Sequence, residues 1–123
     1  MDRSKALAAL SALAHETRLD LIRLLTSQGT EGMAAGQIAE RLGITAPRLS
    51  FHLSALEQAG LLRSLKVARN VFYSVDARGI GLTISFVLND CCCDHPEVLA
   101  ACSHSRRAAA DQGEVAVSGT ENT

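Results

Sequence analysis

The sequence predicts a mostly α-helical domain with one small β-hairpin. Leucine and alanine recur at helical spacing through the first 60 residues, and two short runs rich in apolar and β-branched residues follow them. Aromatic residues make up only 3% of the chain, which disfavours a β-sandwich or a barrel. With 123 residues and 47% hydrophobic content, the chain can bury one core, so a single compact domain is expected.

The first two helices are expected over residues 2–14 and 15–25. Each carries a stripe of apolar residues, which indicates either a core face or a dimer seam. The stripe residues are Leu7, Leu10, Leu13, Leu19, Ile22 and Leu25, with Leu21 and Leu24 widening the second stripe. His15 begins the second helix, and a local structural role is favoured over metal ligation because no cysteine or second histidine is near it in sequence. A glycine-containing loop is expected over residues 27–32.

The segment 34–62 predicts a helix-turn-helix. A first helix over residues 37–42 should end at Gly43, because glycine readily adopts the left-handed conformation that closes many helices. A second helix follows at once, with Thr45 able to cap its first turn and Pro47 tolerated there. One face of this second helix carries Leu49, Leu53 and Leu56, and the other carries Arg48, Phe51 and Ser54. Such a pair of helices is typical of a DNA-reading unit.

Two apolar runs, 61–66 and 71–75, predict a β-hairpin with Arg69 and Asn70 near its tip. An ordinary hairpin would fit this pattern. Its position directly after a helix-turn-helix favours a wing, whose basic tip can reach a phosphate or the adjacent minor groove. A last helix is expected over residues 76–90, where it would pair with the first helix in a dimer.

The distribution of charge supports nucleic-acid binding, although the total does not. The net charge is −1, yet residues 41–70 contain five basic residues and one acidic residue. From residue 71 onward the chain has three basic and seven acidic residues. A basic segment between acidic flanks fits a DNA-facing patch, with a solvated charged face as the alternative interpretation.

Residues 5–92 resemble the ArsR family of small dimeric winged-helix repressors. The motifs that carry the resemblance are LAHETRL at 13–19, IAERLG at 38–43, and LSFHL at 49–53 followed by Leu56 and AGL at 59–61. The resemblance implies a homodimer that pairs its first and last helices. It also implies two recognition helices in successive major grooves of an imperfect palindrome, with half-sites roughly 34–36 Å apart.

The resemblance and the pattern together give a set of candidate DNA-binding residues on the second helix and the hairpin. These are Thr45, Pro47, Arg48, Ser50, Phe51, His52, Ser54, Lys66, Arg69 and Asn70. Arg48 can read guanine through a bidentate contact, and Phe51 can touch a thymine methyl group. His52 matches a histidine of the family, where it either braces the helix or meets a phosphate. The alternative for Phe51 is a core position, although the leucine stripe already supplies the buried face.

All four cysteines lie in the last third of the chain, at Cys91, Cys92, Cys93 and Cys102. Cysteines used only for packing would be scattered, so this cluster indicates a site for a thiophilic ion. In one continuous helix, Cys91 and Cys102 would stand about 16 Å apart at 1.5 Å per residue. The chain must therefore fold back, and Pro96 disfavours helix at the residue before it and so permits the turn.

The family places its effector sites at several positions. The helix before the turn has no cysteine, and residues 76–90 have no histidine, so two of those sites are absent. Cys91–Cys92 looks like the cysteine pair of a third, arsenite-binding branch. Where that branch has its third cysteine, at or before position 99, this chain has Leu99, so Cys102 is the expected third ligand and Cys93 its substitute.

The expected function is therefore a transcriptional repressor released from its operator by trivalent arsenic, either arsenite or a methylated arsenite that needs only two thiolates. A zinc- or cadmium-responsive repressor and a thiol-redox repressor remain alternatives, since cysteine and histidine also form zinc sites. A thiol enzyme that handles arsenic has less support, because the sequence lacks a glycine loop around a cysteine and a Cys-x-x-Cys motif. A module that no longer binds DNA conflicts with the basic patch.

The expected organisation is a winged helix-turn-helix domain over 1–92, a cysteine-rich metalloid-binding segment over 91–104 and a disordered tail over 105–123. No apolar run approaches the roughly 18 residues of a membrane span, and the N-terminus lacks a signal-peptide pattern. A cytoplasmic protein without membrane contact is therefore expected. Its cysteines would be reduced, which favours metal binding or redox sensing over structural disulfides.

Overall fold

The computed structural model describes residues 1–102, and its backbone contacts divide the chain into two units that meet between Thr83 and Ile84. The expected disordered tail over 105–123 lies outside the described residues. No helix among residues 1–102 is long and apolar enough to cross a membrane.

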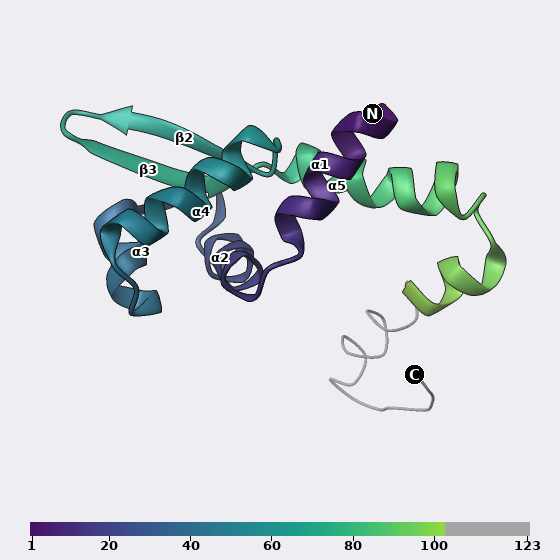
Figure 1. Ribbon diagram of the computed structural model, residues 1–123, viewed down its shortest axis with the longest axis horizontal. Coiled ribbons are helices and arrows are strands. Elements are labelled where there is room, and N and C mark those ends of the chain that lie inside the picture. Colours follow the sequence, from purple (N-terminus) through teal and green to yellow (C-terminus); the bar gives the residue numbers. More distant parts are fainter. Residues whose placement is uncertain (103–123) are drawn as a thin grey trace. The chain divides into compact units, whose positions relative to one another are not determined.

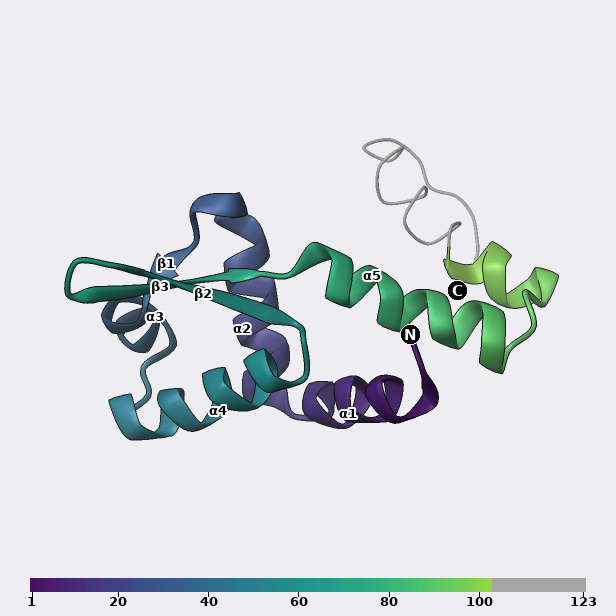
Figure 2. The same ribbon diagram turned by 90° about the horizontal axis from the view of Figure 1, so that it is seen from above.

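The first unit is a winged helix-turn-helix, which confirms the predicted fold class (Figures 1 and 2). Helices dominate it, and three short strands form one small antiparallel sheet. The elements are α1 (Arg3–Leu13), α2 (Glu16–Ser27), the 3₁₀ turn η1 (Gly29–Glu31), β1 (Met33–Ala34), α3 (Ala35–Leu42), α4 (Ala46–Gln58), β2 (Leu62–Val67), β3 (Asn70–Val75) and α5 (Ala77–Ser85). The last of these continues across the boundary between the units.

Local signals explain where the helices begin and end. Gly43 closes α3 with φ 66°, and the Thr45 hydroxyl caps α4 by accepting from the Arg48 amide at 3.4 Å. Both predictions are confirmed. His15 caps α2, because its Nδ1 accepts from the Thr17 amide at 3.2 Å, and this agrees with the local structural role expected for it.

The predicted hairpin is present as β2 and β3, joined so that Val67 pairs with Asn70. The short strand β1 was not expected; it pairs antiparallel with β3, Met33 opposite Tyr73, and gives the strand order β1-β3-β2. Just before β1, Gly32 has φ 73° and lies against the Tyr73 carbonyl, where any Cβ would collide. The chain can pass this close to the sheet only as glycine.

The core lies between α1, α2, α4 and the start of the sheet. The largest fully buried apolar side chains are Leu21, Leu25, Ile38, Leu49, Leu53, Leu56 and Leu61. The α1 stripe divides between the two alternatives, because Leu13 packs against the core while Leu7 is 57% exposed, and α1 turns Ala6, Ala9 and Ala12 inward. Small alanines let α1 pack closely on α2 and α4. On α2, Leu19 is likewise 55% exposed and outside the core.

The second unit begins within the predicted last helix. The α-helical part ends at Ser85, and a π-helix, η2, runs from Phe86 to Cys91. A π-helix has hydrogen bonds between residues five positions apart, and here the Cys92 amide donates to the Val87 carbonyl at 2.9 Å. A further helix covers 96–102.

Candidate nucleic-acid interface

Helix α4 is divided into a buried and an exposed face as the sequence predicts. Leu49, Leu53 and Leu56 belong to the core, whereas Phe51 is 65% exposed. The core alternative for Phe51 is therefore wrong. The other candidate residues of this face that lie exposed are Pro47, Arg48, Ser50 and Ser54. Helix α4 thus offers one basic group, one aromatic ring and two hydroxyls on its outer side.

The turn before α4 fixes the direction in which this face points. The amides of Gly43 and Ile44 both donate to the Ala39 carbonyl, at 2.8 and 3.2 Å. The Thr45 cap then starts α4 immediately, and Pro47 occupies its first turn, where it removes no helical hydrogen bond. Two helices joined this tightly cannot swing independently, so the α3–α4 pair presents the outer face of α4 as one rigid unit.

His52 is placed differently from the other candidates. Only 3% of its surface is exposed, so its ring has almost no surface to offer a phosphate, and the bracing role is the one its position supports. The Arg18 Nε donates to its Nδ1 at 3.0 Å. Burial, followed by the charges of His15, Arg18 and Arg48, lowers the pKa of His52 below its usual 6.5.

Arg18, on α2, is the residue that sequence reasoning missed. Its guanidinium also donates to the Ala12 carbonyl at 3.3 Å and lies over the Phe51 ring, 5.5 Å from the ring centre. A cation inside the motif that resembles the family, three residues after a capping histidine, was the available signal. Nothing in the spacing revealed that it faces α4.

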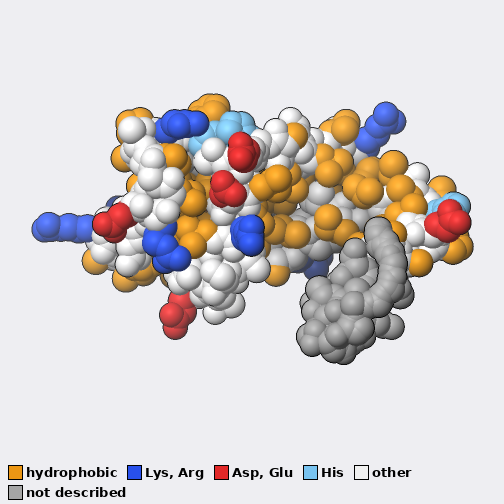
Figure 3. Space-filling model, turned by 90° about the horizontal axis from the view of Figure 1, so that it is seen from below, with side chains coloured by type: hydrophobic (Ala, Val, Ile, Leu, Met, Phe, Trp, Pro, Cys, Tyr) orange, Lys and Arg blue, Asp and Glu red, His pale blue; other side chains and the backbone are white. Residues whose placement is uncertain are grey.

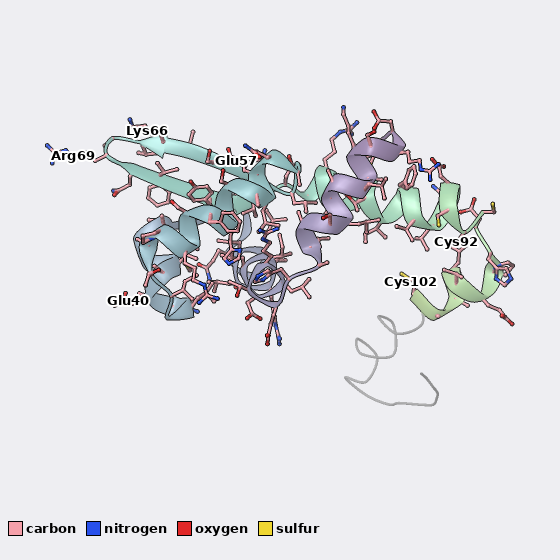
Figure 4. The ribbon with its side chains drawn as sticks, viewed as in Figure 1. Glu40, Glu57, Lys66, Arg69, Cys92 and Cys102 are labelled. Carbon is pink, nitrogen blue, oxygen red and sulfur yellow. The ribbon has the colours of Figure 1, made fainter. Side chains whose placement is uncertain are left out.

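The hairpin tip carries the remaining candidates. Ala68, at φ 58°, and Arg69 form the two-residue connection, and Asn70 is the first residue of β3. Lys66, Arg69 and Asn70 are all exposed, and Figure 4 shows Lys66 and Arg69 projecting from this end of the hairpin, away from the helices. The tip is therefore basic and free to approach a polyanion.

The single acidic residue of the segment 41–70 stands apart from this tip. Glu57, near the end of α4, accepts from the Ser64 hydroxyl of β2 at 2.6 Å. Figure 4 shows it at the base of the hairpin, at the opposite end from Lys66 and Arg69. Its negative charge is thus used at the junction of α4 and β2 rather than near the groups that would meet phosphate.

The four cysteines are all free thiols, three of them exposed and Cys92 half-buried. Cys93 and Asp94 have φ of 51° and 56°, which turns the chain before the helix at 96–102. Figure 4 shows Cys92 at the end of one helix and Cys102 on the helix that folds back, so the expected reversal is present; it lies just before Pro96, which is the first residue of the returning helix.

The reversal does not assemble the expected three-ligand site. Within residues 1–102, no three His, Cys, Asp or Glu side chains lie close enough to hold a metal ion. A single chain therefore does not bring together Cys91, Cys92 and Cys102. It also does not bring together a set of three ligands in which Cys93 replaces one of them. The pKa of Cys92 is raised by its partial burial, and further by the charge of Cys91, its side-chain hydrogen bond and the charge of Cys93.

Comparisons with known proteins agree on the fold. A family described as "Helix-turn-helix domain" matches residues 13–64. The chain is 30% identical over 88 residues to the HTH-type transcriptional regulator YgaV of Escherichia coli, covering 72% of this chain and 87% of that protein. The chain is also similar to the transcriptional activator HlyU of Vibrio cholerae and to the transcriptional repressor SdpR of Bacillus subtilis.

Two solved structures extend the likeness. An ArsR-like transcriptional regulator from Rhodococcus sp. RHA1 superimposes with a TM-score of 0.59 at 26% identity, covering 93% of this chain and 96% of that one. A homodimeric winged helix-turn-helix DNA-binding domain from Mycobacterium bovis gives a TM-score of 0.59 at 26% identity, covering 73% of this chain and 87% of that one. With the exposed face of α4 and the basic hairpin tip, these findings identify the chain as a DNA-binding transcriptional regulator of the ArsR family.

Proposed function

We propose that this regulator is a homodimeric repressor that leaves a palindromic operator when trivalent arsenic binds its C-terminal thiols. The observation that carries the proposal is the placement of the cysteines. All four lie within residues 91–102, and three are consecutive at the junction between the π-helix and the following turn. None is used in the core, so packing does not account for them.

The chemistry of trivalent arsenic suits these thiols. Arsenite carries three hydroxyl groups, and each As–S bond forms as one hydroxyl leaves with the thiol proton as water. Partial burial and the neighbouring thiols raise the pKa of Cys92, which favours the thiol form, and the thiol can still react because its proton leaves with the hydroxyl group as water. Cys91 and Cys92 are adjacent in the chain, so they can supply two As–S bonds to one atom.

The number of thiols distinguishes two arsenical species. A methylated arsenite needs two As–S bonds, which Cys91 and Cys92 can provide. Inorganic arsenite needs a third, from Cys102 or Cys93, and the segment must then change shape because no three ligands are gathered in residues 1–102. That change of shape is the proposed signal.

The start of α5 offers a route from this segment to the DNA-reading helix. The Asp76 amide donates to the Leu61 carbonyl at 2.9 Å, and its carboxylate accepts from the Gly79 amide at 3.0 Å. Gly79 lies so close to the Gly60 carbonyl that a Cβ would collide with it. The beginning of α5 is therefore fixed to the turn that ends α4, and release requires a coupling of about 1–3 kcal/mol between the two sites.

The test is fluorescence anisotropy of the reduced protein on a duplex from its own promoter, titrated with arsenite, methylarsenite, zinc and cadmium. Release by an arsenical at stoichiometric levels, lost in Cys91→Ser or Cys92→Ser, is expected. Cys102→Ser and Cys93→Ser identify the third ligand for arsenite, and each variant is first checked for unchanged operator binding without effector. Equal arsenite affinity with and without operator contradicts the mechanism, because coupling is reciprocal.

The same titration tests the alternative effectors. The three consecutive thiols, of which Cys91 and Cys93 are exposed, and the exposed His95 nearby could also form a zinc or cadmium site or a disulfide switch. Release by zinc or cadmium alone assigns the segment to metal sensing. Release by peroxide that thiol reductant reverses assigns it to redox sensing.

A further inference from the structure

Arg18 joins α2 to two successive residues of α4 that face opposite environments. Its Nε donates to the buried ring of His52 at 3.0 Å, and its guanidinium carbon lies 5.5 Å from the centre of the exposed Phe51 ring. The Phe51 and His52 rings meet edge to face, with centroids 5.5 Å apart. Successive residues of an α-helix point about 100° apart, so a group that touches both sits over the border between the core and the outer face.

Each contact of Arg18 fixes one degree of freedom of the recognition helix. The hydrogen bond to His52 holds the rotation of α4 against α2, and the stacking contact holds the Phe51 ring against the surface. The third contact is a second hydrogen bond, to the Ala12 carbonyl at 3.3 Å, and it anchors the guanidinium itself. The His15 ring packs on His52 from the same helix, with centroids 4.5 Å apart, and closes the cluster.

We propose that Arg18 is a positioning residue of the DNA interface, which clamps Phe51 and His52 so that the free face of the Phe51 ring reads the C5-methyl group of a thymine. The proposal concerns how operator DNA is read without effector and is independent of the arsenic switch. Release by arsenic can fail as a mechanism while the clamp stands, and the reverse also holds.

The clamp requires arginine rather than any cation. A guanidinium is planar, so it can donate sideways from Nε while its face covers an aromatic ring. Lysine carries a compact ammonium group on a flexible stem and cannot make both contacts at once. Exchange of Arg18 for lysine therefore keeps the charge and removes the clamp, which separates positioning from a simple phosphate contact.

The clamp also sets a protonation requirement. Arginine can only donate, so Nδ1 of His52 accepts and the neutral ring carries its proton on Nε2. A proton on Nδ1 removes the acceptor and places a cation beside the guanidinium. The charged groups that act on His52 are His15 and Arg18 from α2 and Arg48 from α4, all basic, and together with burial they lower the pKa of the ring.

The decisive probe is a duplex selected by the wild-type protein from a random library, in which thymines are replaced by deoxyuridine one at a time. This change removes one methyl group and nothing else. Wild type should lose about fourfold in affinity at one thymine of each half-site. Arg18→Lys and Phe51→Ala should bind thymine and uracil duplexes equally. Retained discrimination in Arg18→Lys overturns the proposal.

The salt dependence of binding provides the second readout. If Arg18 only neutralised a phosphate, Arg18→Lys would bind like wild type and Arg18→Gln would lower the salt slope by about 1. The clamp predicts instead that both variants bind weakly with the wild-type slope. Arg23→Lys and Arg23→Gln are the matched controls, because Arg23 is an exposed residue of the same helix. Thermal melting confirms that each variant is folded before binding is compared.

The pH dependence of operator binding provides the third readout. Added positive charge on a protein strengthens phosphate binding, so most proteins bind DNA more tightly as the pH falls. Wild type should instead bind more weakly once the pH falls through the lowered pKa of His52. His52→Asn keeps an acceptor near the Nδ1 position and cannot take up the proton, so it should bind at pH 7.5 and lack this loss. A wild-type affinity that rises at low pH contradicts the clamp.

Discussion

At the scale of single residues, Phe51 is the large apolar side chain that α4 leaves in solvent. Replacement of Phe51 by alanine should change the free energy of unfolding by no more than about 0.5 kcal/mol, since little buried surface is lost. Operator affinity should fall. Leu53→Ala, two residues along the same helix, removes a core side chain and should cost about 2–5 kcal/mol. Urea denaturation and anisotropy of the two variants separate these effects.

Two glycines of α5 should respond oppositely to alanine. A Cβ on Gly79 would collide with the Gly60 carbonyl, a backbone atom that cannot move aside, so Gly79→Ala should lower the melting temperature strongly. Gly81 has nothing within 4 Å of its Cβ position, and Gly81→Ala should stabilise the helix by about 0.5–1 kcal/mol. Thermal melts followed by circular dichroism measure both. Equal responses would mean that the contact between Gly60 and Gly79 does not hold α5.

His52 should make stability depend on pH. Its pKa is lower in the folded protein than the ordinary 6.5 of the unfolded chain, so between these two values the unfolded state binds the additional proton. The stabilisation from the neutral ring is complete above pH 6.5 and is lost as the pH falls through the folded-state pKa. Urea midpoints from pH 7.5 to 5.0 should fall in wild type more than in His52→Asn. Parallel profiles would exclude His52 as the source.

At the scale of elements, the hairpin tip should act through charge alone. Lys66→Gln and Arg69→Gln remove exposed cations, so stability should change little. If each meets one phosphate, each variant should weaken binding to all sequences about equally and lower the salt slope by about 1. Anisotropy against salt, on the selected duplex and on an unrelated one, measures this. A loss confined to the selected duplex would instead assign the tip to base reading.

The helices and strands also show which parts of the fold can be predicted from the sequence. The helix-turn-helix was predictable because its signals are local: Gly43 must adopt φ 66°, and Thr45 and Pro47 mark the next helix start. Strand β1 was not predictable, since two residues carry no periodicity and the strand exists only by pairing with β3. The inward face of α1 could not be chosen from the sequence because leucine and alanine share the same spacing, and the structure buries Ala6, Ala9 and Ala12.

The candidate site likewise has a part that could be predicted from the sequence and a part that could not. The outer residues of α4 and the basic tip follow from periodicity and composition, which are properties of one segment. The clamp does not, because the contact of Arg18 with His52 joins residues 34 positions apart. The arrangement of the cysteines depends on a π-helix, and no proline or glycine between Phe86 and Cys91 announces it.

At the scale of the whole molecule, the exposed leucines of α1 are the residues on which the proposed homodimer can be tested. Figure 3 shows hydrophobic side chains spread over much of one face, and Leu7 and Leu10 are among the exposed apolar residues of the chain. Leu7→Lys should convert a dimer into monomers and weaken operator binding, because one half-site contact is then lost from each bound molecule. Val67→Lys, which changes an exposed apolar residue of the hairpin, should leave the dimer intact. Analytical ultracentrifugation distinguishes the two outcomes.

The π-helix of Phe86–Cys91 has a consequence for how such a chain can diversify. A π turn closes over one residue more than an α turn, so it absorbs a single inserted residue without breaking the helix. The π-helix lies beyond Thr83, outside the unit that contains the helix-turn-helix. Loss of one residue would return the segment to α-helical spacing and rotate every later side chain by about 100° relative to those before it. Descendants of this gene can therefore re-aim their thiols through single-codon insertions and deletions while inheriting the same DNA-reading domain.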